Sequence, residues 1–445
     1  MSSKNTLRGR KARAASRPSL ALECLESRLA LAVLGGNVNA QLVGSTLLLT
    51  GDALDNALVV STATGGRMAV LGGLGTTING STSPFVTSRP VTSIVANLNA
   101  GNDIIGFTNS AVGLVNQLTP LGIFSPFAPT LQADIDAATG GIPTFTLPGS
   151  VTVTTAAGND AVGLIGTVGG SVAANLGSSS SVAGPGQGNG FTIGNPSDSS
   201  VANRIGGSLS VVGGNQRDAV KVYGTDVGGG VSAALGNGEN FAFLFGFGST
   251  FGSLAYTGGT GQDGVSLQLG LSVRNGVSIF TGPQGEDIVS VVQTVNIGGS
   301  LVVNTGVGND RDELLLTGSV RRDVSVATGG GNDFIQMSST VVGGLAVSSG
   351  AGSDLVQVLP SSVGLNAVID AGAGDDQVGV SSLSVRYNLT VSLGGGTDGL
   401  TLINVSAFAA FLYGGTGTNT LNIDAPSRTG IRTLRYYQFQ TVNNI

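Results

Sequence analysis

A Gly-x-Gly pair followed two residues later by an Asp recurs in this chain about every 22 residues. "TGVGND" ends at Asp310, "TGGGND" at Asp333, "SGAGSD" at Asp354, "AGAGDD" at Asp376 and "LGGGTD" at Asp398. A unit this short holds only two or three strands and cannot bury its own apolar face, so it must stack on copies of itself. The repeat therefore predicts a solenoid.

Apolar residues alternate with polar ones on both sides of the Asp, which is typical of a strand with one buried face. With the Asp as position zero, they fall at −9 and −7, at +2 and +4, and near −13. Before the Asp these residues are Leu301, Val303, Val324, Val326, Leu345, Val347, Leu389 and Val391, preceded near −13 by Ile297, Val320, Val363 and Val385. After the Asp they are Ile335, Met337, Val356, Val358, Val378, Val380, Leu400 and Leu402. The glycines at −4 and −2 indicate a tight turn with positive φ or close backbone approach.

This pattern predicts an all-β fold, a parallel β-solenoid in the form of a three-faced β-helix, which we expect to be right-handed. It has about 22 residues per rung and roughly 15 rungs. At ~4.8 Å per rung, the rod would be on the order of 70 Å long. Position zero falls at residues 55, 77, 103, 160, 181, 218, 240, 263, 287, 310, 333, 354, 376, 398 and 419.

The spacing also divides the chain into segments. Residues 1–32 are predicted to be an export leader, 33–428 the solenoid, and 429–445, richer in Arg and aromatic residues, a C-terminal cap. Two wide gaps indicate insertions. Residues 113–149 contain "TLQADIDAA", a short predicted helix, and residues 183–200 form a Gly/Ser-rich loop.

Composition excludes several classes of chemistry and of partner. The chain has no His, and its single Cys is Cys24 within the leader, which removes His-based triads, disulfides and Cys or His metal sites. Residues 1–32 carry a charge of +5 and the whole chain −6, so residues 33–445 stand at −11. That charge argues against nucleic acid as a partner. No later segment has 18 consecutive apolar residues, so no membrane span is expected.

The first 32 residues have a basic start and end in alternating Leu and Ala. Because Glu23, Glu26 and Arg28 interrupt the apolar part, the residues alone leave a signal peptide and a disordered basic tail equally open. "LALECLESRLALA" (20–32) resembles the Leu-Glu-x-Leu-Glu-x-Arg-x-Leu motif that opens many planctomycete extracellular proteins. The resemblance implies export to the cell surface or extracellular space, with the leader removed, and implies no activity.

The repeating Asp has two interpretations, of which the first is calcium binding. "GGTGQDGVSL" (258–267) and "GGTGTNTLNI" (414–423) resemble the repeats of hemolysin-type calcium-binding proteins. In that family Asp carboxylates and turn carbonyls hold Ca²⁺, a cation that prefers oxygen ligands. The candidate ligands are Asp263, Asp287, Asp310, Asp333, Asp354, Asp376 and Asp398.

The second interpretation is structural turn closure. Thr77, Ser181, Asn240 and Asn419 occupy position zero in other rungs. Like Asp, these residues hydrogen-bond nearby backbone N–H groups in turns. A metal site in these rungs would lack the negative charge that Asp supplies. The 22-residue period also departs from the nine-residue period of the calcium-binding family. We therefore predict turn closure first and calcium binding as the alternative.

Two other segments are candidate sites. Phe241, Phe243, Phe245, Phe247 and Phe251 crowd residues 236–251, where we predict a core-facing strand rather than an exposed patch for a glycan or protein partner. Charged residues gather in "NQRDAVKV" (215–222) and "SVRRDVSV" (319–326), where weak surface ion pairs are predicted and a lyase or glycosidase site is the alternative. They are Arg217, Asp218, Lys221, Arg321, Arg322 and Asp323.

The sequence as a whole favours an exported, non-enzymatic β-solenoid that serves as a structural or adhesive component of a cell surface or matrix. No catalytic residues and no required cofactor are predicted, and its expected partners are surface or matrix components, glycans and calcium ions. A calcium-dependent adhesion module is the first alternative. A β-helix polysaccharide lyase or glycosidase is the second.

Overall fold

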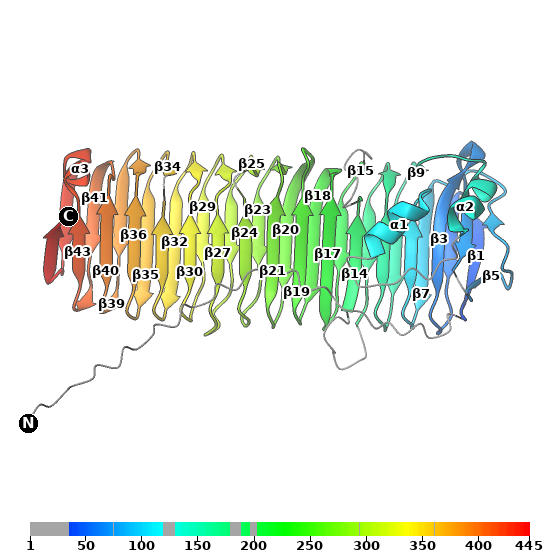
Figure 1. Cartoon of the computed structure of the whole chain (residues 1–445), viewed down its shortest axis with the longest axis horizontal. Helices are drawn as coiled ribbons and strands as arrows, with labels where there is room; N and C mark the ends of the chain where they lie inside the picture. Colours follow the sequence, from blue (N-terminus) through cyan, green and yellow to red (C-terminus); the bar gives the residue numbers. More distant parts are fainter. Residues whose placement is uncertain are drawn as a thin grey trace, which may run out of the picture.

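Successive copies of the repeat stack as turns of one coil, which runs the length of a straight rod (Figure 1). The structure is a computed structural model that describes residues 35–73, 75–118, 130–178, 188–195, 203–292, 294–359 and 361–445. The predicted leader lies outside these residues. The coil has about 13 turns, about 22 residues apart, and irregular levels built partly from antiparallel hairpins precede them. The predicted parallel β-solenoid is confirmed.

Each regular turn contributes three strands, and equivalent strands of successive turns pair in parallel in three stacks. The first stack contains β9 (Phe145–Leu147), β12 (Gly166–Val168), β15 (Asn203–Ile205), β22 (Ser272–Val273), β25 (Asn296–Ile297), β28 (Ser319–Val320), β31 (Thr340–Val341), β34 (Ser361–Val363) and β37 (Leu383–Val385). Four longer strands run through both the first and the second stack: β18 (Thr225–Gly236), β20 (Thr250–Gly258), β41 (Ala407–Tyr413) and β44 (Ile431–Tyr437).

The second stack also contains β2 (Thr46–Thr50), β7 (Ser93–Asn99), β10 (Val151–Thr155), β13 (Val172–Asn175), β16 (Leu209–Val212), β23 (Val277–Phe280), β26 (Leu301–Asn304), β29 (Val324–Ala327), β32 (Leu345–Ala351), β35 (Ala367–Ala373) and β38 (Asn388–Ser392), with the short β39 (Gly395–Gly396) and β42 (Thr416–Gly417) beside it. The third stack contains β3 (Ala57–Ala63), β8 (Ile104–Phe107), β11 (Ala161–Leu164), β14 (Gly188–Ile193), β17 (Arg217–Tyr223), β19 (Asn240–Phe245), β21 (Asp263–Gln268), β24 (Ile288–Val291), β27 (Glu313–Leu316), β30 (Phe334–Met337), β33 (Leu355–Val358), β36 (Gln377–Ser381), β40 (Gly399–Ile403), β43 (Thr420–Ile423) and β45 (Thr441–Asn444).

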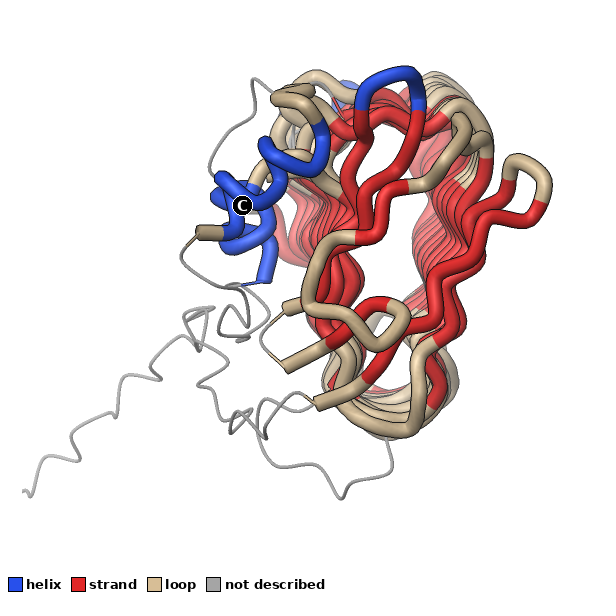
Figure 2. The backbone as a smooth tube through the Cα atoms, turned by 90° about the vertical axis from the view of Figure 1, so that its right-hand side faces the viewer, coloured by secondary structure: helices blue, strands red, loops and turns tan. Residues whose placement is uncertain are grey.

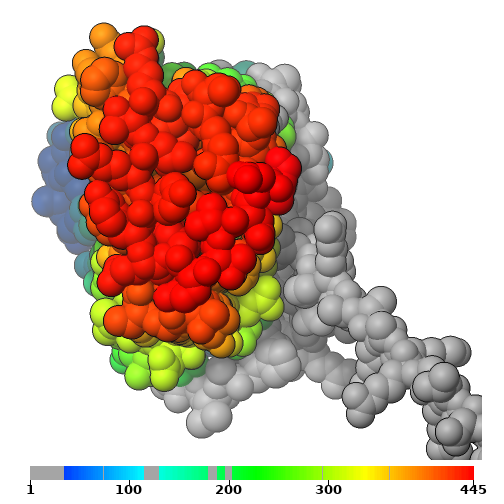
Figure 3. Space-filling model, turned by 90° about the vertical axis from the view of Figure 1, so that its left-hand side faces the viewer, coloured from blue at the N-terminus to red at the C-terminus, as the bar shows by residue number. Residues whose placement is uncertain are grey.

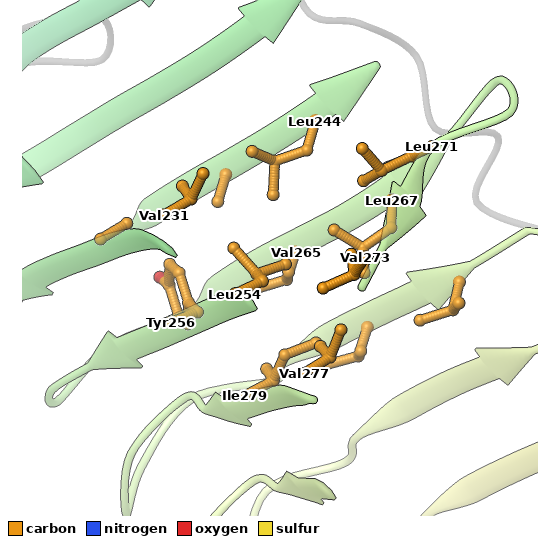
Figure 4. Close-up of a cluster of buried hydrophobic side chains, with 14 of the residues drawn as sticks. Val231, Leu244, Leu254, Tyr256, Val265, Leu267, Leu271, Val273, Val277 and Ile279 are labelled. Carbon is orange, nitrogen blue, oxygen red and sulfur yellow. The ribbon is translucent and has the colours of Figure 1, made fainter. Parts of the chain in front are cut away.

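The alternation of apolar residues places one set of side chains inside the coil. In β26 and β29 the register pairs Leu301 with Val324 and Val303 with Val326, so like residues lie above one another. All the apolar positions predicted before and after the repeating Asp are buried, and they belong to one core that runs the length of the rod. Figure 4 shows such side chains from neighbouring turns, among them Leu244, Leu254 and Val265, pointing toward one another. Seen along the rod, this core lies between the stacked strands (Figure 2).

Antiparallel hairpins close the N-terminal end, and two helices pack beside it on strands of the third stack and on β4 (Arg67–Gly72). β1 (Asn37–Val43) pairs with β2 and with β5 (Thr77–Ile78), and β4 pairs with β3 and with β6 (Phe85–Val86). A short 3-10 helix, η1 (Thr64–Gly66), joins β3 to β4. The helices α1 (Ala111–Leu118) and α2 (Leu131–Thr139) lie outside the coil (Figure 2).

The predicted "TLQADIDAA" helix is thus α2. It buries Leu131 and Ile135 in a small second core against Val59 of β3. None of the described helices is long and apolar enough to cross a membrane.

The tail predicted as a separate cap continues the coil as its last turn. After α3 (Ala425–Gly430), β44 pairs in parallel with β41 and β45 pairs with β43. Figure 3 shows this turn forming the end face of the rod. Tyr436 and Tyr437 of this turn are both exposed.

The predicted glycine turns precede the third stack. Gly352 and Gly374 have φ values of 128° and 133°, a region that L side chains rarely adopt. A Cβ on Gly352 would lie 1.6 Å from the carbonyl oxygen of Gly331 in the preceding turn. Positive φ and close backbone approach therefore act together at this corner.

Candidate functional site

A column of buried Asp and Asn side chains, ending at the exposed Gln440, runs along the corner that precedes the third stack. The backbone N–H of each member donates to the side-chain oxygen of its counterpart in the next turn. Asp333 N–H, for example, lies 2.8 Å from Asp354 Oδ1. We call this column the ladder; it consists of Asn56, Asp103, Asp160, Asn189, Asp218, Asn240, Asp263, Asp287, Asp312, Asp333, Asp354, Asp376, Asp398, Asn419 and Gln440.

The ladder joins adjacent turns in two ways. Each side chain after Asn56 accepts an N–H from the turn before it, and each ladder carbonyl before Gln440 accepts an N–H from the turn after it. The Asp333 carbonyl, for example, accepts from Leu355 N at 2.9 Å. Buried backbone donors need an acceptor, and here a side chain supplies it where the chain turns a corner. The predicted closure within a single turn is therefore wrong as the main role, although Asp218 Oδ2 also accepts from Gly214 N at 2.7 Å.

Six of the seven predicted candidate ligands belong to the ladder, namely Asp263, Asp287, Asp333, Asp354, Asp376 and Asp398. The seventh, Asp310, does not. It is only half-buried, and its Oδ2 accepts from Gly285 N at 2.7 Å. Asp312 takes its place because this turn is two residues longer, and Leu314 and Leu316 then fall at +2 and +4 inside the core.

Three other predicted positions differ from the structure. Asn56 rather than Asp55 is the first ladder member, and Thr77 lies in β5, paired with Asn37. Ser181 lies outside the described residues, and Asn189 is the ladder member of that turn. The predicted loop insertion at 183–200 therefore contains a regular strand, β14, whose Phe191 and Ile193 are buried at +2 and +4.

Burial raises the pKa of every ladder aspartate, since a carboxylate loses its hydration there. The pKa is raised to about 8 at Asp103. It is raised to about 7 at Asp263, Asp287 and Asp312, and to about 6 at Asp160, Asp218, Asp333 and Asp376. The pKa values of Asp354 and Asp398 are raised as well. Hydrogen bonds from the preceding turn oppose the shift, and neighbouring carboxylates add to it. The ladder therefore changes charge near neutral pH.

The second side-chain atom of the ladder residues is satisfied only in part. Hydroxyl groups of Thr281 and Thr305 donate to Oδ2 of Asp287 and Asp312. Asn240 Nδ2 donates to the Gly236 carbonyl at 2.9 Å. Within the described part of the chain, seven other carboxylates have an Oδ2 without a hydrogen bond of normal geometry: Asp103, Asp160, Asp263, Asp333, Asp354, Asp376 and Asp398.

The ladder gives a calcium ion few ligands in one place. Ca²⁺ takes about six to eight oxygen ligands, whereas each turn offers one carboxylate whose Oδ1 is already used by a backbone N–H. Among the described residues, no group of three or more His, Cys, Asp or Glu side chains could hold a metal ion. Among the described ladder residues, these seven Oδ2 atoms are the carboxylate oxygens that remain for a cation.

The crowded phenylalanines form an outer surface rather than core. In β19, Ala242 and Leu244 point inward at +2 and +4 from Asn240. Phe241, Phe243 and Phe245 therefore point outward, where they are half-buried, and the predicted core-facing arrangement is wrong for these three. Phe251 is buried and Phe247 is exposed.

The outward rings stack in a row. The centroid distances are 6.1 Å between Phe241 and Phe243 and 6.4 Å between Phe243 and Phe245. Tyr223 of the preceding turn stacks on Phe245 at 5.2 Å. The Arg217 guanidinium lies 5.0 Å from the centre of the Phe241 ring, within the range of a cation–π contact.

The two charged segments place their Arg and Asp side chains in different surroundings. Asp218 is buried in the ladder, whereas Arg217 lies at the surface over Phe241. Burial, and to a lesser extent the charge of Arg217, lowers the pKa of Lys221 to about 8. Asp323 Oδ1 accepts from Gly344 N at 2.8 Å, and its neighbours Arg321 and Arg322 are exposed. The Asp side chains of both segments thus accept backbone N–H groups of neighbouring turns.

No model of a known protein family, no curated protein and no solved structure matches this chain. The fold and the ladder geometry are therefore the basis for any functional assignment.

Proposed function

We propose that this chain is an exported, non-enzymatic structural or adhesive component of a cell surface or extracellular matrix. The observation that carries the proposal is the continuity of the ladder and the core. Adjacent turns are joined by parallel strands at three stacks, and the ladder adds a hydrogen bond at nearly every step from Asn56 to Gln440. Such a rod is stiff along its length and presents repeated outer faces, as a scaffold or adhesin requires.

The distribution of charged side chains supports a non-enzymatic role. An acid–base pair needs two groups within reach of one substrate. Here the aspartates nearest to Arg217 and to Arg322 in sequence accept backbone N–H groups instead. Asp218 thereby joins its turn to the preceding one, and Asp323 joins its turn to the following one.

Export can be tested by determining, in the cells that make the protein, which fraction contains it and which residue forms its N-terminus. We expect the chain in the extracellular or surface fraction, with its N-terminus beginning near residue 33 because the leader has been removed. Limited proteolysis of intact cells followed by mass spectrometry checks both points. A chain that retains Met1 and is digested only after cell lysis would contradict export.

Calcium-dependent adhesion is the second candidate, favoured by the unpartnered carboxylate oxygens of the ladder. A ligand that binds only the folded state adds ~2.7 kcal/mol to the free energy of unfolding when its concentration is a hundred times Kd, and the melting temperature rises accordingly. If calcium binds there, thermal melts followed by circular dichroism will rise by several degrees between EDTA and millimolar calcium.

That rise should disappear in Asp333→Asn/Asp354→Asn. It should persist in the matched variant Asp370→Asn, which removes an exposed carboxylate from β35 outside the ladder. Identical melts with and without calcium would leave the ladder a purely structural device.

A further inference from the structure

A groove with a volume of about 480 Å³ crosses the corner between the first and second stacks in the last three turns. Its lining includes Arg386 and Tyr387 from one turn, Ser406 and Phe408 from the next, and Arg432 from the last. Tyr387 and Phe408 are 43% and 56% exposed, so their rings are open to a ligand. The lining contains no acidic residue.

A one-residue shortening of the corner creates the groove. Ser384 is level with Ser406, yet Asn388 is level with Ala409, so the second turn makes the same corner with one residue fewer. The Tyr387 carbonyl consequently accepts two N–H groups, from Phe408 at 2.9 Å and from Ala409 at 3.3 Å. The following turn keeps the shorter corner, since Ala409 is level with Thr433. The groove is therefore a step in the rod, fixed by backbone pairing.

Two guanidinium groups are held beside aromatic faces at this step. The Arg386 Cζ lies 5.3 Å from the centre of the Tyr387 ring, and the Arg432 Cζ lies 6.0 Å from that of Phe408. These are cation–π distances, which orient a guanidinium without using its N–H donors. The acidic residue that begins α3, Asp424, is engaged elsewhere. Its Oδ1 accepts from Ser427 N at 2.8 Å and its Oδ2 from Asn404 N at 2.9 Å.

We propose that this groove binds the carboxylate or sulfate groups of an acidic polysaccharide. A guanidinium is a planar fork that pairs with such groups through two hydrogen bonds. The exposed faces of Tyr387 and Phe408 suit the apolar face of a sugar ring. Residues 33–445 carry a charge of −11, so long-range attraction does not bring an anion here and recognition depends on the local site.

An acidic peptide fits the groove less well. Extended peptides gain much of their affinity from main-chain hydrogen bonds to a free strand edge. At this step the N–H groups of Phe408 and Ala409 already donate to Tyr387, and the edge of β44 that is not paired with β41 lies on the end face of the rod. The groove exposes guanidinium groups and aromatic ring faces. An acidic sugar chain can contact the first with its acidic groups and the second with its sugar rings.

Calorimetric titration of the purified chain with tetragalacturonate tests the proposal, with maltotetraose as the uncharged sugar and tetraglutamate as the acidic peptide. We expect tetragalacturonate to bind at least tenfold more tightly than either. Affinity should fall as salt is raised. Sodium galacturonate and sodium sulfate, as the free anions, should bind weakly, because they lack the extended sugar face. An absence of tetragalacturonate binding, or equal affinity for tetraglutamate, would overturn the assignment.

Substitutions in the groove test whether tetragalacturonate binds there. Arg386→Gln/Arg432→Gln should weaken tetragalacturonate binding at least tenfold, and so should Phe408→Ala. The matched variant Arg321→Gln/Arg322→Gln removes two exposed arginines from an equivalent corner several turns away and should bind as the original chain does. Circular dichroism melts must be the same for all variants, so that a loss of binding is not a loss of fold. Equal weakening by both arginine pairs would refute the site in favour of general charge attraction.

Discussion

Replacing Gly352 by alanine is expected to destabilise the rod by more than about 3 kcal/mol. Gly352 has a φ of 128°, and a Cβ there would lie 1.6 Å from the carbonyl oxygen of Gly331. That oxygen belongs to the backbone of the preceding turn, so no side-chain rotation can relieve the contact. The same approach recurs where Gly374 meets the carbonyl of Gly352, at 2.0 Å. One turn would have to move away from the next, which breaks both the ladder and the strand pairing.

Gly379→Ala is the matched control for this prediction. Gly379 lies in β36, its φ is not positive, and an added Cβ would meet no atom within 4 Å. We expect that variant to keep its stability or to gain slightly, because alanine has less backbone freedom to lose on folding. Urea unfolding followed by circular dichroism measures both variants. Equal stabilities for Gly352→Ala and Gly379→Ala would show that the turns are not in close backbone contact.

The second large effect is a loss of stability as the pH rises toward neutrality. Burial raises the pKa of Asp263 to about 7 in the folded chain, from 3.8 in the unfolded chain. The folded state therefore binds the proton more tightly. Its contribution to stability is fully present below about pH 4 and is lost as the pH rises through about 7. Asp103, Asp287 and Asp312 act in the same direction. We expect the melting temperature to be highest near pH 4 to 5 and to fall toward pH 8.

Asp263→Asn should reduce that fall and stabilise the rod at pH 8 by about 2 kcal/mol. The preceding turn shows that an amide fits the site. Asn240 Nδ2 donates to the carbonyls of Gly236 and Gly238, and glycines occupy the same two positions before Asp263. The control is Asp310→Asn, which removes a charge from the same corner outside the ladder. Thermal melts from pH 4 to pH 8 make the comparison. A destabilised Asp263→Asn at pH 8 would mean that the ladder carboxylates are ionised and needed as such.

Most of the fold could be predicted from the sequence, because the apolar residues at +2 and +4 identify the face of the third strand that points into the core. The same rule resolves the errors at the corner. Leu314 and Leu316 fix Asp312 rather than Asp310 as the ladder residue, and Phe191 and Ile193 identify Asn189. Ala242 and Leu244 likewise turn the neighbouring phenylalanines outward. Gly-x-Gly spacing was the weaker guide, since a turn tolerates one or two extra residues while a buried strand face does not.

Other features depend on how two turns meet, and a single repeat does not contain them. That the Asp side chain serves the backbone of the preceding turn, rather than its own, follows from the stacking register. The cationic groove arises because Ala409, and not its neighbour, is level with Asn388. The spacing of the repeat predicts where each turn begins. A register offset of one residue between two turns is seen only in the strand pairing of the structure.

The direction of the ladder bears on the order in which the rod can form. Every ladder side chain after Asn56 reaches back toward the N-terminus, to an N–H of a turn that comes earlier in the chain. A newly added turn thus brings its own acceptor and finds its donor already in place, while its own ladder N–H is paired when the following turn arrives. Growth can be vectorial, each completed turn serving as the template for the next. For a chain delivered N-terminus first through a narrow passage, folding would keep pace with arrival, and only the most recent turn would have an open edge.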